Sequence, residues 1–127
     1  MTTLTREFAE QFAQEWIAAW NAHDLERIFG HYTDDFEMSS PLIVERMNEP
    51  SGTLRGKDAI RPYWSRGLAT TPPLHFELDE VLLGVRSVVL VYRNALQRRV
   101  TETLFFDDRL RVNRGMAHYG APPAPAS

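Results

Sequence analysis

The chain has 127 residues, of which 43% are hydrophobic and 24% are charged, and these values are typical of one globular domain. Its 14 basic and 17 acidic residues give a formal net charge of −3, and the arginines are scattered, which argues against a nucleic-acid partner. No apolar stretch reaches the roughly 18 residues that a membrane span needs. The N-terminal segment has acidic residues where a secretory signal is apolar, so we expect a cytoplasmic protein with no membrane partner.

The sequence contains no cysteine, which excludes disulfides, thiol nucleophiles and thiolate metal sites. Its four histidines, at positions 23, 31, 75 and 118, show neither the i,i+4 spacing nor the HExxH pattern of a helical metal site. We therefore expect neither a metal nor a cofactor.

Two helices are predicted at the start of the chain. Between Thr5 and about Asn21, large apolar residues recur at every fourth position, which is typical of one face of an amphipathic helix. These residues are Phe8, Phe12, Trp16 and Trp20. The polar break after Asn21 contains Asp24, which can cap a short second helix that ends near Gly30.

The next part of the chain is less regular. Residues 36–40 alternate in the manner of a strand, which Pro41 ends. Residues 41–56 contain several turn-forming residues, and we expect a loop with short strand pieces there. Residues 43–44 and 53–54 are the candidates for pairing within that loop.

The second half of the chain predicts one helix and an antiparallel meander. The helix begins at Gly56 and ends near residue 70, before Pro72. Four segments rich in β-branched and aromatic residues follow, separated by short turns, at residues 75–83, 87–96, 99–107 and 110–119. We expect a single domain over residues 1–120 and a flexible tail of proline and alanine over residues 121–127.

Several of these segments resemble the nuclear transport factor 2-like superfamily. The run WIAAWNAHDLE at residues 16–26, followed by IFGHYTDDF at residues 28–36, resembles its opening. The run GKDAIRPYW at residues 56–64 is similar to the start of its third helix, and AHYG at residues 117–120 is similar to its closing strand. The resemblance implies a cystatin-like α+β fold, in which a cone-shaped, curved, mixed or antiparallel sheet and three helices in the N-terminal half enclose a pocket. It also implies SnoaL-like relatives, among them polyketide cyclases and proteins related to ketosteroid isomerase, and no single activity.

The ketosteroid isomerases of this superfamily use a carboxylate at the end of the first strand as base, with a phenol on helix one and a second acid on a later strand. The resemblance places Ser40 at the base and Trp16 at the phenol, so the base is missing. It places Glu102 opposite the second acid, where an apolar pocket would favour the neutral carboxyl and allow it to act as a general acid. The alternative placement of Glu102 is the outer face of the sheet, paired with an arginine.

The end of the last strand gives a second test of catalytic candidates. The cyclases and epoxide hydrolases of the superfamily have an acid there, and its nearest match in this chain is Ala117. Strand alternation places Tyr119 on the same face as Ala117 and His118 on the opposite face. We therefore expect Tyr119 inside the pocket and His118 outside it.

The predicted pocket is apolar with few polar points. Its expected ligand-binding residues are Trp16, Trp20, Tyr32, Phe36, Met38, Ser40, Trp64, Asn113 and Tyr119, beside the catalytic candidate Glu102. Such a pocket suits a SnoaL-like protein that binds a small, largely apolar molecule and isomerises, dehydrates or cyclises it by using Glu102. The alternative is a non-catalytic ligand-binding or association domain of the same fold.

Both faces of the predicted strand at residues 87–96 are apolar. Val88, Leu90 and Tyr92 alternate with Val89 and Val91, and only one of these two sets can line the interior. No further helix is predicted to cover the other set. We therefore expect a homodimer through the outer face of the sheet.

Overall fold

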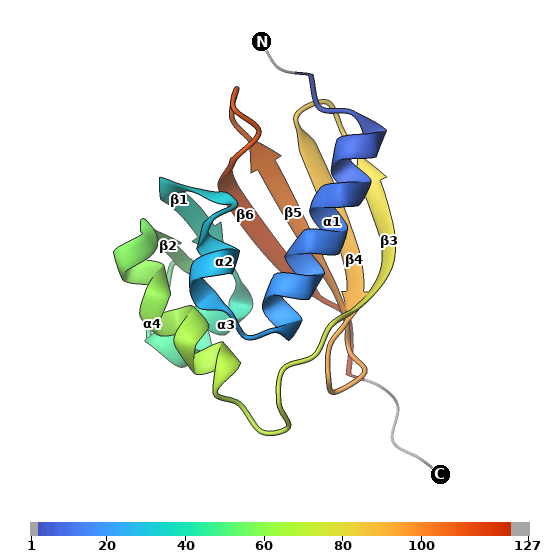
Figure 1. Ribbon diagram of the computed structural model, residues 1–127. Coiled ribbons are helices and arrows are strands. Elements are labelled where there is room, and N and C mark those ends of the chain that lie inside the picture. Colours follow the sequence, from blue (N-terminus) through green and yellow to red (C-terminus); the bar gives the residue numbers. More distant parts are fainter. Residues whose placement is uncertain (1–2, 123–127) are drawn as a thin grey trace.

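The computed structural model describes residues 3–122, and helices cover one face of a curved sheet in it (Figure 1). The elements, in chain order, are α1 (Arg6–Asn21), α2 (Leu25–Phe29), β1 (Tyr32–Ser39), α3 (Pro41–Met47), β2 (Thr53–Arg55), α4 (Lys57–Leu68), β3 (Glu77–Leu83), β4 (Ser87–Arg93), β5 (Arg99–Phe106) and β6 (Val112–Tyr119). Helix α1 lies over the part of the sheet that contains β3, whereas α2 and α4 lie over β1 (Figure 1). In the predicted tail, residues 121–122 have no regular secondary structure. Residues 123–127 of the tail lie outside the described residues.

The sheet is mixed, with the strand order β2-β1-β6-β5-β4-β3. The four C-terminal strands form the predicted antiparallel meander. Strand β1 pairs with β6 in parallel and with β2 in antiparallel orientation. The predicted α+β fold with a curved mixed sheet is therefore confirmed.

Residues 41–47 form helix α3, so the predicted loop over residues 41–56 is wrong in this part, and residues 3–122 contain four helices rather than the three expected. The Ser40 side chain accepts a hydrogen bond from the Leu42 backbone N–H at 3.1 Å, and Pro41 occupies the first turn, where it has no N–H to leave unpaired. Asn48, with φ 53°, ends the helix. Ser-Pro therefore begins a helix here rather than only ending a strand.

The expected pairing of residues 43–44 with residues 53–54 is also wrong. Residues 53–55 form strand β2 and pair with β1, where Met38 lies opposite Leu54. Because β2 completes the edge of the sheet, α3 is left free to pack against α4 and β2.

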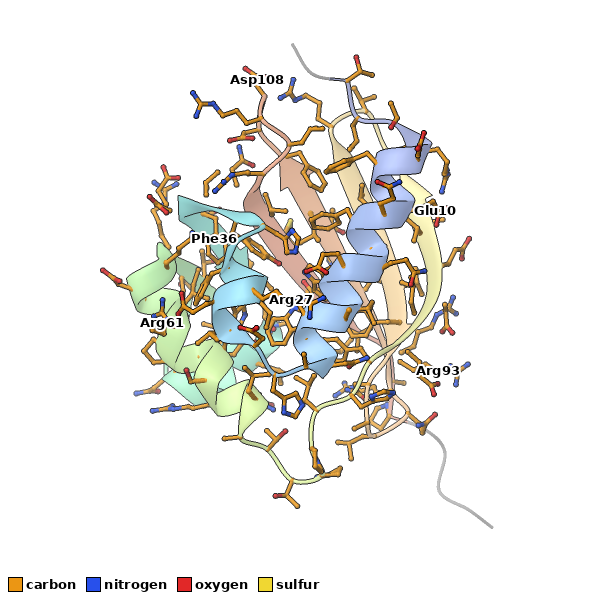
Figure 2. All side chains as sticks on the ribbon, in the orientation of Figure 1. Glu10, Arg27, Phe36, Arg61, Arg93 and Asp108 are labelled. Atoms are coloured by element: carbon orange, nitrogen blue, oxygen red, sulfur yellow. The ribbon has the colours of Figure 1, made fainter. Side chains whose placement is uncertain are left out.

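Helix α1 carries the stripe of buried residues that the sequence predicts. The Thr5 side chain accepts a hydrogen bond from the Phe8 N–H at 3.1 Å and caps the helix. Ala9, Ala13 and Ala19 are fully buried, and their small side chains let the helix approach the sheet closely. The core is mainly apolar, and charged side chains such as Arg61 and Arg93 point outward (Figure 2).

Candidate functional site

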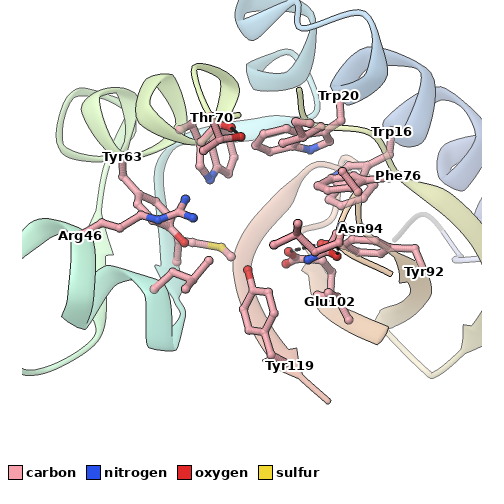
Figure 3. Close-up of a pocket in the computed structure, with 18 of the residues that line it drawn as sticks. Trp16, Trp20, Arg46, Tyr63, Thr70, Phe76, Tyr92, Asn94, Glu102 and Tyr119 are labelled. Carbon is pink, nitrogen blue, oxygen red and sulfur yellow. Dashed lines mark hydrogen bonds between the residues drawn. The ribbon is translucent and has the colours of Figure 1, made fainter. Parts of the chain in front are cut away.

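A cavity of about 250 Å³ lies between helices α1 and α4, the end of α3, the segment before β3 and the inner face of β4, β5 and β6 (Figure 3). Its volume lies just below the roughly 300–1,000 Å³ that small-molecule sites have. The lining residues are Trp16, Trp20, Tyr32, Met38, Leu42, Arg46, Tyr63, Trp64, Gly67, Thr70, Thr71, Pro72, Leu74, Phe76, Tyr92, Asn94, Ala95, Leu96, Val100, Glu102 and Tyr119. The site is thus a small aromatic cavity with a few polar groups.

The tryptophans on the helices form one side of the cavity. Trp16 and Trp20 are one helical turn apart on α1, and their ring centroids are 5.9 Å apart. Trp20 meets Trp64 of α4 edge to face at 5.1 Å, and Trp16 stacks on Phe76 at 5.8 Å. These contacts hold several flat aromatic surfaces around the cavity.

Glu102 lies inside the cavity and not on the outer face. It stands on β5 opposite Leu90 of β4 and Ala117 of β6, and only 7% of the residue is exposed. The Tyr92 hydroxyl donates a hydrogen bond to its Oε1 atom at 3.1 Å (Figure 3). Burial raises the pKa of Glu102 from 4.5 to about 7, and the hydrogen bond from Tyr92 opposes this rise. The carboxyl can therefore both accept and release a proton near neutral pH.

A further donor lies near this acid. The Trp16 Nε1–H, which the resemblance places at the phenol position, already donates to the Tyr32 hydroxyl at 2.9 Å. The donor that remains is the Tyr32 O–H itself. Burial and the charge of Glu102 raise the pKa of Tyr32, which keeps this hydroxyl protonated and able to donate.

A second polar group lies on the opposite side of the cavity, at the start of α3. The Tyr63 hydroxyl of α4 donates to the Ser40 Oγ atom at 3.2 Å. Ser40, which is expected to bind the ligand, is buried behind the cavity wall and contacts the lining residue Tyr63 without lining the cavity itself. Tyr119 borders the cavity between the two polar groups, and burial raises its pKa (Figure 3).

Like Ser40, two further residues that are expected in the pocket do not line the cavity. Phe36 is fully buried in the core and packs 4.4 Å from the Tyr32 ring, behind the cavity wall. Asn113 lies on the outer face, in a polar hollow that also contains Asp35 and Arg114. The reason is a β-bulge: the register between β5 and β6 shifts at this residue, so simple alternation from Tyr119 assigns it to the wrong face.

The other expected residues fall where alternation places them. His118 is exposed on the outer face, opposite Thr101 of β5. Tyr119 faces the cavity, as do Met38 and Trp64. Asp34 lies away from the cavity, where it is exposed and forms an ion pair with Lys57 at 3.2 Å.

Three residues of the polar groups around Glu102 and Ser40 are not among those expected from the sequence. Arg46 is missed because residues 41–47 are assigned to a loop. Tyr92 lies diagonally across from Glu102 on the neighbouring strand, a position that only the β4–β5 register reveals. Tyr63 follows the helical repeat of the apolar face of α4 and could have been found from that pattern.

A curved mixed sheet, covered by helices that enclose an aromatic cavity with one buried acid, defines the class of nuclear transport factor 2-like domains. The family model of the SnoaL-like domain matches residues 13–120. The chain belongs to the SnoaL-like family. No curated protein matches the chain in sequence.

Solved structures agree with this assignment. A SnoaL-like protein of unknown function from Burkholderia thailandensis is 49% identical, with a TM-score of 0.90 over 94% of this chain and 100% of that chain. A candidate hydroxylase, AclR from Streptomyces galilaeus, is 18% identical, with a TM-score of 0.71 over 91% of each chain. A candidate isomerase of the SnoaL-like family from Agrobacterium tumefaciens is 15% identical, with a TM-score of 0.70 over 89% of this chain and 97% of that chain. The last two likenesses show the fold alone.

Within residues 3–122, no helix is long and apolar enough to cross a membrane.

Proposed function

We propose that the cavity binds a small, largely apolar molecule and that Glu102 moves a proton within it. The observation that carries this proposal is one buried carboxyl, hydrogen-bonded to Tyr92, in a cavity otherwise lined mainly by aromatic and apolar side chains. A structural carboxyl in such a place would need an ionic partner, and no Lys, Arg or His of the described residues forms an ion pair with Glu102. A pKa near the working pH is the property that general acid–base catalysis requires.

The arrangement supports a proton shift next to a carbonyl group. The Glu102 carboxylate takes a proton from a carbon beside the carbonyl, and the electron pair of that C–H bond moves to the carbonyl oxygen. The Tyr32 or Tyr119 hydroxyl donates a hydrogen bond to the resulting enolate oxygen. Glu102 then returns the proton to another carbon, which completes an isomerisation. Dehydration and cyclisation begin with the same removal of a proton.

Exchange of protons with solvent tests this proposal before any natural substrate is identified. 2-Tetralone is a small aromatic ketone with acidic C–H bonds beside its carbonyl group. In D₂O, we expect the protein to accelerate deuterium incorporation at these positions, as followed by NMR. The Glu102→Gln variant should lower the protein-dependent rate by about 10²–10⁴-fold, the usual effect of losing a general acid–base group.

The matched control is Asn113→Ala, because Asn113 lies on the outer face. It should exchange 2-tetralone at the wild-type rate. Equal protein-dependent rates for the wild type and Glu102→Gln would remove the catalytic role of Glu102. Binding of 2-tetralone without any exchange would favour the non-catalytic binding domain.

We also propose that the protein forms a homodimer through the outer face of the sheet. Thr103 of β5 lies at the centre of this face, opposite Val89 of β4 and Met116 of β6. Val89 and Met116 are half-buried, and none of the described helices covers this face (Figure 1). A second copy of the chain would remove these apolar side chains from water.

A further inference from the structure

Arg46 is a guanidinium group at the mouth of the cavity that has no partner of its own. It is exposed, it lines the cavity, and no carboxylate of the described residues lies within ion-pair distance of it. Its backbone is held in place, because the Arg66 side chain of α4 donates a hydrogen bond to the Arg46 carbonyl oxygen at 2.5 Å. A Cβ atom at Gly67 would lie 3.8 Å from the Arg46 Nη1 atom, so α4 passes close beside the guanidinium.

The end of the cavity beside Arg46 is suited to a hydrogen-bond acceptor on a ligand. Figure 3 shows Arg46 beside Tyr63 on one side of the cavity and Glu102 with Tyr92 on the other. The positive charge of Arg46 lowers the pKa of both Tyr63 and Tyr119, against the larger effect of burial, so all three groups share one electrostatic environment. The Tyr63 O–H already donates to Ser40, so Arg46 and the Tyr119 hydroxyl are the donors left for an anionic oxygen.

The space between the two polar groups suits a flat molecule. Trp20 and Trp64 border it on the helix side, and Trp16 continues this side towards Glu102. The Trp20 Nε1–H is buried and has no hydrogen-bond partner among the described residues. A ligand that carries an acceptor atom on this side of the cavity would satisfy it.

We propose that the ligand is a flat conjugated acid, whose anionic oxygen binds Arg46 and the Tyr119 hydroxyl while its ring system extends between the tryptophans towards Glu102. This inference rests on the proposed function and adds the chemical class of the ligand to it. An anion rather than a cation is expected, because Glu102 is the only acidic side chain among the described residues that line the cavity. Burial already favours the neutral form of that carboxyl.

Two probes of the same shape test this inference. 2-Naphthoate carries a carboxylate, and 2-naphthamide replaces it by a neutral amide. In isothermal titration calorimetry at pH 6, where Glu102 is mostly neutral and 2-naphthoate is ionised, we expect the wild-type protein to bind 2-naphthoate at least about tenfold more tightly than 2-naphthamide, the usual effect of a hydrogen bond to a charged group. Arg46→Gln should abolish this preference and leave the affinity for 2-naphthamide unchanged, which also shows that the variant is folded.

The matched control is Arg109→Gln, which removes the same charge at an exposed position between β5 and β6. It should keep the preference for 2-naphthoate. Equal binding of the two probes by the wild type, or a preference that survives in Arg46→Gln, would overturn the inference. Tighter binding of 2-naphthylmethylammonium than of 2-naphthoate would overturn it as well.

The outcomes separate this inference from the proposed function. Binding of 2-naphthamide without a preference for 2-naphthoate refutes the anion site and leaves proton transfer by Glu102 standing. A preference that depends on Arg46, together with 2-tetralone exchange that does not depend on Glu102, supports the anion site and refutes the catalytic role. Failure of the wild type to bind any of the probes contradicts both.

Discussion

Replacing Glu102 by Gln should change how the stability of the protein depends on pH. In the folded protein burial raises the pKa of this carboxyl to about 7, whereas in the unfolded chain it returns to about 4.5. Between these values the folded protein holds a proton that the unfolded chain has lost. Protonation of Glu102 therefore contributes to stability in full below about pH 4.5, and this contribution disappears as the pH rises through about 7.

The magnitude follows from the size of the pKa rise. At about 1.4 kcal/mol for each pH unit, the rise corresponds to about 3 kcal/mol of unfolding free energy, gained by the wild type at pH 4 and absent at pH 8. Glu102→Gln has the shape of the protonated carboxyl and cannot ionise. Its unfolding free energy, taken relative to the wild type, should therefore increase by about 3 kcal/mol from pH 4 to pH 8.

Urea unfolding at several pH values, followed by tryptophan fluorescence, measures this difference. All three tryptophans border the cavity, so their emission reports the loss of this part of the fold. Glu45→Gln is the matched control, because it removes an exposed carboxyl. A difference between Glu102→Gln and the wild type that stays constant within about 0.5 kcal/mol would refute the reasoning, because Glu102 would then ionise alike in the folded and unfolded chain.

The remaining predictions concern single contacts. Tyr92→Phe removes the hydrogen bond that favours the Glu102 carboxylate, so the midpoint of the pH effect should move above about 7 in the same urea series, and an unchanged midpoint would contradict this contact. Trp16→Ala should cost about 3–5 kcal/mol of unfolding free energy in urea, because the side chain is buried and bonded to Tyr32, and a cost below 1 kcal/mol would show that the packing is not as described. Thr103→Arg should convert a dimeric wild type into a folded monomer in sedimentation velocity, and a wild type that is already monomeric at micromolar concentration would exclude the proposed interface.

The sequence predicts the helices with a regular apolar stripe and the antiparallel strands, because burial of one face leaves a clear period in each. Helix α1 and the meander of β3 to β6 are examples. It fails for α3, because Ser40 and Pro41 are residues that both end strands and begin helices. The contact of α3 with β2 and α4 distinguishes the two cases, and it depends on residues 53–68, which lie outside the local Ser-Pro pattern.

In the site, too, the sequence predicts the positions that follow a regular local pattern and fails where the strand register decides. Tyr119 and His118 are assigned to the correct faces, because β6 alternates regularly over its last residues. Asn113 is assigned wrongly, because a bulge inserts one residue and no periodic pattern marks it. The sequence leaves the orientation of Glu102 open, since both faces of β5 hold apolar or small side chains and only the pairing with Leu90 and Ala117 determines it.

Ser40 limits how the ligand preference of this protein could change during evolution. Its one side-chain oxygen accepts hydrogen bonds from both the Leu42 N–H, which begins α3, and the Tyr63 hydroxyl, which borders the cavity. A substitution that altered the polarity beside Tyr63 would also remove the cap of the helix that carries Arg46, at a cost of about 1 kcal/mol. Variation in ligand preference should therefore accumulate at residues such as Leu74 and Leu96, which border the cavity from loops and cap no helix.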